Sequence, residues 1–311
     1  MKSWAPALAE MGQMVAVGTV GETPPSLVDG VPWVEVTPDD MAATAGRVIG
    51  NSWWGPTRGR GGYVHHSVPR RDNPAGGDGL TQEEYAGVCA GLGTQLAVSQ
   101  FVADAVTDRL GLAASRIPLF AHPAFQVASR PRAIRDVVYA SRLSEAKGAA
   151  LALGLAERMT DISFTFVVNG HEPACLSRLA QLTARSHGRV RSIQARRDPR
   201  SVAVTIAGHA VLIMPTPTAT EEAFGLLSVE AQHAGVRVVS TRSGGLPETD
   251  CGLLTTTDGS LTALSNALRF ALTSPAVTET QRERAAAHFT LPESVAALHR
   301  MLTAADAAGE R

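Results

Sequence analysis

Two glutamates, Glu222 and Glu230, stand eight positions apart on either side of an aromatic–glycine pair, in the run E-A-F-G-L-L-S-V-E. The run follows a short apolar strand pattern, His209–Pro215, and precedes another at Val236–Ser240. The carboxylates therefore lie where a strand gives way to a helix, at the carboxyl edge of a parallel sheet, and open α/β sheets bind ligands at this edge. A helix that begins near Gly225–Leu226 offers free N–H groups to a phosphate or a sugar hydroxyl. With Glu222 in the loop and Glu230 about a turn into the helix, we expect both to face one crevice.

The second half of the chain alternates apolar strand patterns with helical patterns, which predicts an α/β fold with a parallel, doubly wound sheet. The predicted strands are Asp136–Ala140, Ile162–Val168, Val190–Ile193, Ala210–Met214 and Val236–Ser240. The predicted helices are Gly148–Met159, Cys175–Arg185, Leu261–Ala271, Gln281–His288 and Pro292–Ala308.

The first half has shorter and looser patterns. Its predicted helices are Trp4–Met11, Gln82–Leu92 and Gln100–Leu110. Its predicted strands are Met14–Val17, Val34–Val36, Arg47–Ile49, Tyr63–His65 and Gln95–Ser99. The proline-containing stretch Phe120–Pro131 is predicted to be a linker. We therefore expect two Rossmann-like domains, residues 1–128 and 129–288, with a cleft between them. A last helix in 289–311 is expected to pack back toward the first domain.

The composition is that of an ordinary globular protein, with 44% hydrophobic and 18% charged residues, and a length of 311 residues favours two domains. The formal net charge of −1 argues against a nucleic acid or an anionic membrane as the main partner. No apolar run has the length needed for a transmembrane segment. The cysteines, Cys89, Cys175 and Cys251, fit neither a zinc spacing nor a disulfide framework, so we expect a cytoplasmic protein.

Several sequence motifs follow one another between about Gly93 and Gly259. They are Gln95–Val102 (Q-L-A-V-S-Q-F-V), Tyr139–Gly148 (Y-A-S-R-L-S-E-A-K-G), Phe166–Gly170, Pro215–Glu230 and His233–Pro247 (H-A-G-V-R-V-V-S-T-R-S-G-G-L-P). In this order and spacing they resemble the motifs of the GT-B glycosyltransferases of glycosyltransferase family 4. The resemblance covers about half of the chain.

The resemblance implies a GT-B fold, with two Rossmann-like domains facing across a cleft. It also implies retaining transfer of a sugar from a nucleotide diphosphate-sugar, with a UDP-sugar as the favoured donor. The acceptor would be a small molecule, a glycan or a lipid-linked group. The chain has no Asp-x-Asp pair to hold a divalent metal, so no metal or other cofactor is expected. Arg142 and Lys147 would instead supply the positive charge for the leaving diphosphate, and that phosphate would help to deprotonate the acceptor in a same-face displacement.

The same resemblance assigns roles to individual residues. Glu230 would accept hydrogen bonds from the ribose hydroxyls, Glu222 would contact the sugar hydroxyls, and Gly244–Gly245 would let the backbone approach the donor. The implied catalytic residues are Arg142, Lys147, Glu222 and His66. The implied donor-binding residues are Phe224, Gly225, Leu226, Leu227, Glu230, Gly170 and Ser141.

Some assignments stay open on the sequence. Either His65 or His66 could face the cleft, and Trp53–Trp54 could stack on a sugar or fill the core of the first domain. Ser141 stands where the family has a glycine, and F-A-H-P-A-F at Phe120–Phe125 replaces the usual Asn-Gly motif.

The opening strand of the family and its Gly-Gly loop are missing from the start of the chain, which predicts either a start further upstream or a shortened member. A shortened, catalytically degenerate homologue that binds nucleotide or a partner protein is therefore the second hypothesis. A third, nucleotide-sugar epimerisation, is disfavoured by the Glu222–Glu230 spacing and by the Arg142 and Lys147 motif.

Overall fold

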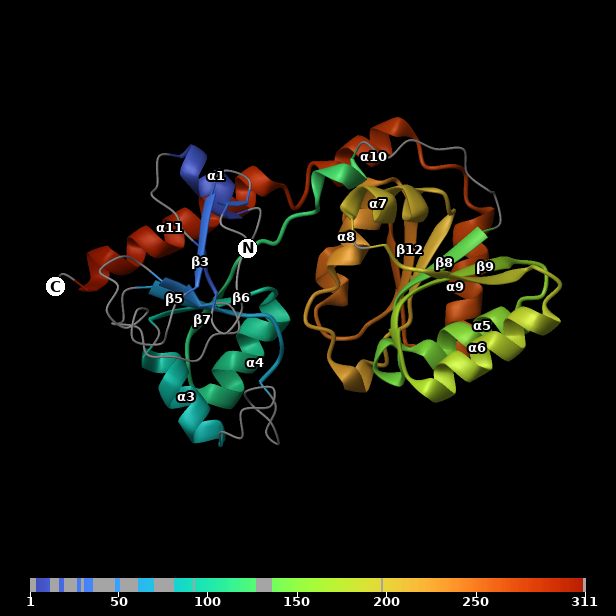
Figure 1. The fold of residues 1–311 in the computed structure, drawn as a ribbon, viewed down its shortest axis with the longest axis horizontal. Helices are drawn as coiled ribbons and strands as arrows, with labels where there is room; N and C mark the ends of the chain where they lie inside the picture. Colours follow the sequence, from blue (N-terminus) through green and yellow to red (C-terminus); the bar gives the residue numbers. More distant parts are fainter. Residues whose placement is uncertain are drawn as a thin grey trace. The chain divides into compact units, whose positions relative to one another are not determined.

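A computed structural model of the protein describes residues 4–11, 17–19, 27–28, 31–35, 48–50, 61–69, 81–91, 93–126, 136–196 and 198–309. The chain folds into two compact units (Figure 1). The first unit combines Met1–Leu119 with Thr290–Arg311, and the second is the continuous stretch Phe120–Phe289. Both units are α/β with parallel strands, and the predicted class of two Rossmann-like domains is confirmed.

The second unit is built on a six-stranded sheet in which every neighbouring pair is parallel. Its strands in chain order are β8 (Asp136–Leu143), β9 (Ser163–His171), β10 (Val190–Gln194), β11 (Val211–Met214), β12 (Arg237–Thr241) and β13 (Leu254–Thr257). In space they follow the order β10-β9-β8-β11-β12-β13. Counted from β8 this is 3-2-1-4-5-6, the order of a dinucleotide-binding sheet, and the direction of winding reverses between β8 and β11.

Helices cover both faces of this sheet (Figure 1). The helices of this unit are α5 (Ala149–Arg158), α6 (Pro173–Arg185), α7 (Pro199–Ala207), α8 (Leu226–His233), α9 (Leu261–Thr273) and α10 (Glu279–Ala286). Alternate residues of β8 serve the two faces: Val137 and Tyr139 pack with α5, α6 and α9, whereas Val138 packs with α7 and α8. The central strands β8, β11 and β12 are mainly apolar because both of their faces are buried, as is typical of parallel sheets.

The first unit contains a parallel four-stranded sheet, β4 (Val48–Gly50), β5 (Gly61–His65), β6 (Thr94–Ala97) and β7 (Ala114–Arg116). A second, three-stranded sheet consists of β1 (Val17–Thr19), β3 (Val31–Glu35) and β2 (Leu27–Val28). Its helices are α1 (Trp4–Glu10), α3 (Gln82–Gly91), α4 (Gln100–Leu110) and the last helix of the chain, α11 (Leu291–Gly309). α11 packs on α1 and β6, and Trp4 Nε1 donates to Ser294 Oγ at 2.8 Å.

Some boundaries differ from the sequence patterns for identifiable reasons. Ser99, expected to close a strand, instead caps α4, where its Oγ accepts the Val102 N–H at 3.1 Å. The predicted linker is ordered at its start, because Phe125 is 2% exposed and packs in the core beneath α7. Residues 120–126 therefore belong to the second unit, and 127–131 lie outside the described residues.

Candidate functional site

A pocket of about 180 Å³ lies at the carboxyl edge of the second unit's sheet, between the ends of β8 and β11. This is the point where the winding of the sheet reverses, and ligands of such sheets bind there. The β8 side contributes Tyr139, Ala140, Ser141 and Lys147. The β11 side contributes Ile213, Met214, Thr216, Glu222, Gly225, Leu226 and Leu227. The walls are thus mostly apolar, with one cation, one carboxylate and a few hydroxyl groups.

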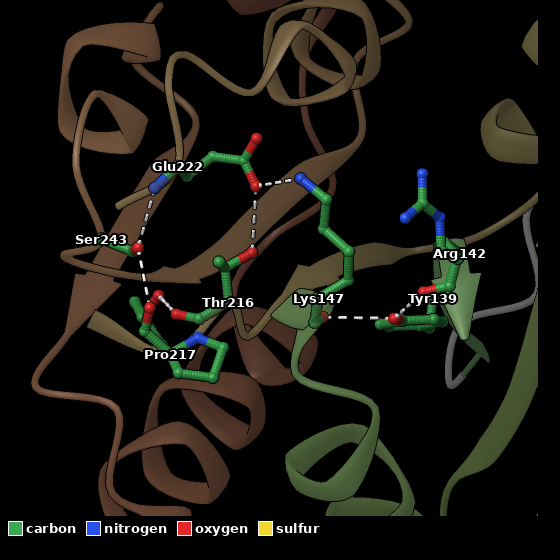
Figure 2. A network of polar contacts seen from close by, with 8 residues as sticks. Tyr139, Arg142, Lys147, Thr216, Pro217, Glu222 and Ser243 are labelled. Atoms are coloured by element: carbon green, nitrogen blue, oxygen red, sulfur yellow. Dashed lines mark hydrogen bonds and ion pairs between the residues drawn. The ribbon is translucent and has the colours of Figure 1, made fainter. Parts of the chain in front are cut away.

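The two charged residues of the pocket are paired with each other (Figure 2). Lys147 Nζ lies 2.6 Å from Glu222 Oε2, and the same oxygen accepts the hydroxyl of Thr216 at 3.3 Å. The Glu222 side chain is 12% exposed and that of Lys147 is 37% exposed. The site therefore carries a cation that is already neutralised by a carboxylate of the protein.

The backbone of Glu222 is fixed by the turn after β12. Its N–H donates to Ser243 Oγ at 3.2 Å, and its carbonyl accepts the N–H of Gly245 at 2.8 Å. Ser243 in turn donates to the carbonyl of Pro217 at 2.9 Å (Figure 2). Gly244 has φ +51°, and a Cβ there would lie closer than 3.0 Å to the Glu222 backbone. The Gly-Gly pair therefore allows two loops to meet and hold this glutamate.

Lys147 ends the short 3-10 turn Glu145–Lys147 that follows β8. The Tyr139 hydroxyl donates to the carbonyl of Arg142 at 2.8 Å and approaches the carbonyl of Lys147 at 3.2 Å, which joins the strand to the turn (Figure 2). Gly148 follows with φ +72°, and a Cβ there would collide with the carbonyl oxygen of Pro215. The loops after β8 and β11 are consequently in direct contact.

Arg142 lies on the part of β8 that extends beyond the sheet's core, and its side chain is exposed. Figure 2 shows its guanidinium apart from the Lys147–Glu222 pair. Gly170, on the neighbouring end of β9, lies next to it: a Cβ there would be 3.5 Å from Arg142 Cγ. Two of the predicted phosphate-binding groups, Arg142 and Lys147, thus come from the same short segment, and only Lys147 lines the pocket.

The first turn of α8 forms another wall, through Gly225, Leu226 and Leu227. The helix begins where the sequence predicted, at Leu226, and no side chain caps it. Gly225 has φ +91°, and a Cβ there would collide with Leu246. Phe224 does not line the pocket, because its ring is buried and packs against Phe289 at 5.5 Å between centroids.

Glu230 is half-buried on α8 and is not among the residues that line the pocket. Its Oε1 accepts the backbone N–H of His122 at 3.4 Å. Burial raises the pKa of Glu230 to about 7, although the His122 N–H opposes this shift. Of the two glutamates expected to face one crevice, Glu222 lines this pocket and Glu230 does not.

The remaining predicted residues lie in the first unit. His65 is 2% exposed, and burial lowers its pKa to about 4, although the hydrogen bond between its Nε2 and Gln95 Oε1, at 2.9 Å, opposes this shift. His66 follows β5 and has an exposed side chain. Neither histidine lines the pocket of the second unit. Trp53–Trp54 lie outside the described residues.

Three polar residues of the site were not singled out from the sequence. Thr216 and Ser243 bind Glu222 directly, and Tyr139 joins β8 to the lysine turn. Thr216 and Ser243 each follow a buried strand at the carboxyl edge, and this position was the signal that could have identified them, whereas Tyr139 lies within β8. Within the described part of the chain, no group of three or more His, Cys, Asp or Glu could hold a metal ion.

The stretch of the chain that contains this pocket is similar to known proteins. Residues 134–274 match the family described as Glycosyl transferases group 1. A curated human relative, one of the subunits of phosphatidylinositol N-acetylglucosaminyltransferase, is 36% identical over 118 residues. That match covers 36% of this chain and 23% of the human protein, so the chain spans about a quarter of its length.

Solved structures share the fold. A glycosyltransferase from Rickettsia africae has a TM-score of 0.74 at 13% identity, covering 97% of this chain and 93% of its own. Anabaena Alr3699/HepE, crystallised with UDP and glucose, has a TM-score of 0.62 at 18% identity, covering 80% of this chain and 72% of its own. At these identities the similarity establishes the GT-B type of fold alone. In the described residues, no helix is both long and apolar enough to cross a membrane.

Proposed function

We propose that the chain, whose residues 134–274 match the family Glycosyl transferases group 1, transfers a sugar from a nucleotide diphosphate-sugar to an acceptor. We further propose a UDP-sugar donor, retention of anomeric configuration and independence from metal ions. The observation that carries the proposal is the pocket between β8 and β11, where the winding of the sheet reverses. This pocket combines Lys147, Glu222 and the uncapped start of α8.

The chemistry of the pocket suits a leaving diphosphate. As the glycosidic bond to phosphate breaks, negative charge gathers on the phosphate oxygens, and cations fixed nearby stabilise that transition state. Lys147 reaches the pocket and exposed Arg142 lies on the same segment. The first N–H groups of α8, at Leu226 and Leu227, add a partial positive charge from the helix dipole. These groups do the work that a divalent metal does in other transferases.

The two glutamates have separate roles in this proposal. Glu222, held at the pocket wall, accepts hydrogen bonds from hydroxyls of the donor sugar. Glu230, a turn further along α8, accepts them from the ribose. The UDP part of the proposal rests on the neighbouring fold of HepE, whose structures contain UDP and UDP-glucose. The acceptor, a small molecule, glycan or lipid-linked group, is proposed to be chosen by the first unit.

Thermal unfolding with a panel of nucleotides tests the donor site. UDP, GDP, ADP and TDP are compared at one common concentration; a nucleotide present at about a hundredfold over its dissociation constant should stabilise the binding unit by about 2.7 kcal/mol, a shift of a few degrees. We expect UDP to give the largest shift, with EDTA and with magnesium alike. Release of UDP from UDP-glucose, followed in the same buffers, then reports turnover.

The possible results separate the hypotheses. A UDP shift with UDP release supports transfer. A UDP shift without turnover for any acceptor class would favour the nucleotide-binding homologue that does not catalyse. No shift with any nucleotide would contradict the proposed function, and a strict need for magnesium would contradict the metal-independent part.

A further inference from the structure

Lys147, the cation proposed to bind the diphosphate, is held by a carboxylate of the protein itself. Its Nζ lies 2.6 Å from Glu222 Oε2, and both residues line the same pocket. Any phosphate that takes Lys147 as its counter-ion must therefore compete with Glu222. Breaking this ion pair therefore reduces the binding free energy of every anionic ligand that uses Lys147.

Of the two partners, Glu222 is the fixed one. Its backbone is bound on both sides, by Ser243 Oγ at 3.2 Å and by the Gly245 N–H at 2.8 Å, and its side chain is 12% exposed. Lys147 has a longer, more flexible side chain that is 37% exposed. We therefore expect the Lys147 side chain to move from the Glu222 carboxylate to the phosphate, while Glu222 stays in place.

Losing Lys147 is unfavourable for Glu222. Its Oε2 would retain the Thr216 hydroxyl, at 3.3 Å, and a largely buried carboxylate that loses its ionic partner is destabilised. A sugar hydroxyl next to Oε2 can donate a hydrogen bond and compensate for the loss. A sugar nucleotide brings both a phosphate for Lys147 and hydroxyls for Glu222, whereas a nucleoside diphosphate brings only the phosphate.

We propose that Glu222 competes with the diphosphate for Lys147, so that the site disfavours the nucleoside diphosphate product relative to the intact sugar nucleotide. The inference rests on the proposed function and deepens it. Once the sugar has been transferred, Glu222 loses its hydroxyl partners and re-forms the pair with Lys147. The carboxylate thereby promotes release of the product.

Isothermal titration with UDP and UDP-glucose tests the competition. Glu222→Gln keeps the size of the side chain and its capacity to bond a hydroxyl, but removes the charge that attracts Lys147. We expect the variant to bind UDP up to about fivefold tighter, since this factor corresponds to about 1 kcal/mol, the most that a partly exposed ion pair contributes. Affinity for UDP-glucose should change less, so the ratio of the two dissociation constants shifts toward UDP.

Two further variants show whether Lys147 is the cause. Glu145→Gln removes an exposed carboxylate from the same turn as Lys147, and should change both affinities alike. In a Lys147→Met background, Glu222→Gln should no longer tighten UDP binding, because the cation for which carboxylate and phosphate compete has been removed. Thermal unfolding of each variant checks that it remains folded.

The contrary results are distinct. A wild-type chain that binds UDP, with the same UDP to UDP-glucose ratio in Glu222→Gln, overturns the competition and leaves the proposed function standing. Tightening that persists in the Lys147→Met background overturns it as well. A wild-type chain that binds neither ligand contradicts the proposed function, and the inference with it.

Discussion

Lys147 is the residue on which the proposed chemistry depends most. Replacing it with alanine should abolish transfer and weaken UDP binding by about tenfold or more, because a charge-assisted bond to phosphate contributes about 1.5–3 kcal/mol. The folded state should be little affected, since a partly exposed ion pair contributes at most about 1 kcal/mol. Turnover, UDP titration and thermal unfolding measure the three effects.

A matched loss of positive charge provides the control for that variant. Arg185 is exposed and pairs with Glu157 on the α5–α6 side of the unit, away from the pocket lining. Arg185→Ala should leave transfer unchanged. Near-normal turnover in Lys147→Ala would contradict the phosphate-binding role.

Glu230 should make stability depend on pH. Burial raises its pKa from 4.5 to about 7, so between these values the unfolded chain has released a proton that the folded chain still holds. Through this group, the free energy of unfolding should fall as the pH rises from about 4.5 to about 7, and stay level above. Urea unfolding of wild type and Glu230→Gln at pH 5 and pH 8 measures the effect. The variant should gain on the order of 2 kcal/mol over wild type between the two conditions, after discounting for partial exposure. An equal difference at both pH values would contradict the shift.

At the scale of elements, the contact between the loops after β8 and β11 can be tested at Gly148. Both Gly148 (φ +72°) and Gly188 (φ +83°) are left-handed, but only at Gly148 would a Cβ meet another atom, the Pro215 carbonyl oxygen. Gly188→Ala should cost about 1 kcal/mol from backbone strain alone. Gly148→Ala should cost several times more and weaken UDP binding, because the lysine turn is displaced. Chemical unfolding of both variants makes the comparison, and equal losses would show that the loops do not form a rigid contact.

The same elements show what the sequence can and cannot predict. The location of the site followed from apolar strands alone, because parallel strands bring their carboxyl ends to one edge. The strand Leu254–Thr257 was missed because three of its four residues are threonines at the outer edge of the sheet. β8 runs past its expected end at Ala140 because Ser141 pairs with Val168 of β9, which local polarity does not reveal.

Contacts between residues that are far apart in the chain could not be predicted from the sequence. Lys147 and Glu222 are 75 positions apart, and Glu230 and His122 are 108 apart. The resemblance named three of these residues, but not that the first two would bond each other. No periodicity connects residues on different loops, so only the packed structure shows which charges meet.

At the scale of the whole molecule, each unit has a core of its own, and the first includes the last helix. Leu298 on α11 is fully buried, as is Leu179 (1% exposed) on α6 in the second unit. Truncating either to alanine should cost about 2–5 kcal/mol. In calorimetry we expect Leu298→Ala to lower one unfolding transition and Leu179→Ala the other. UDP should raise only the transition that Leu179→Ala lowers. A single transition that moves in all three cases would mean that the units unfold together.

The route of the chain through α11 also bears on the order in which the protein matures on the ribosome. The second unit, Phe120–Phe289, is continuous, so all of its strands have been synthesised before α11. The first unit starts earlier, yet Ser294, which bonds Trp4 and Pro118 of the same unit, is synthesised only after the whole second unit. Domains usually fold as units, from the amino terminus onward, during synthesis. Here the second unit should become protease-resistant first, and the first unit should follow it.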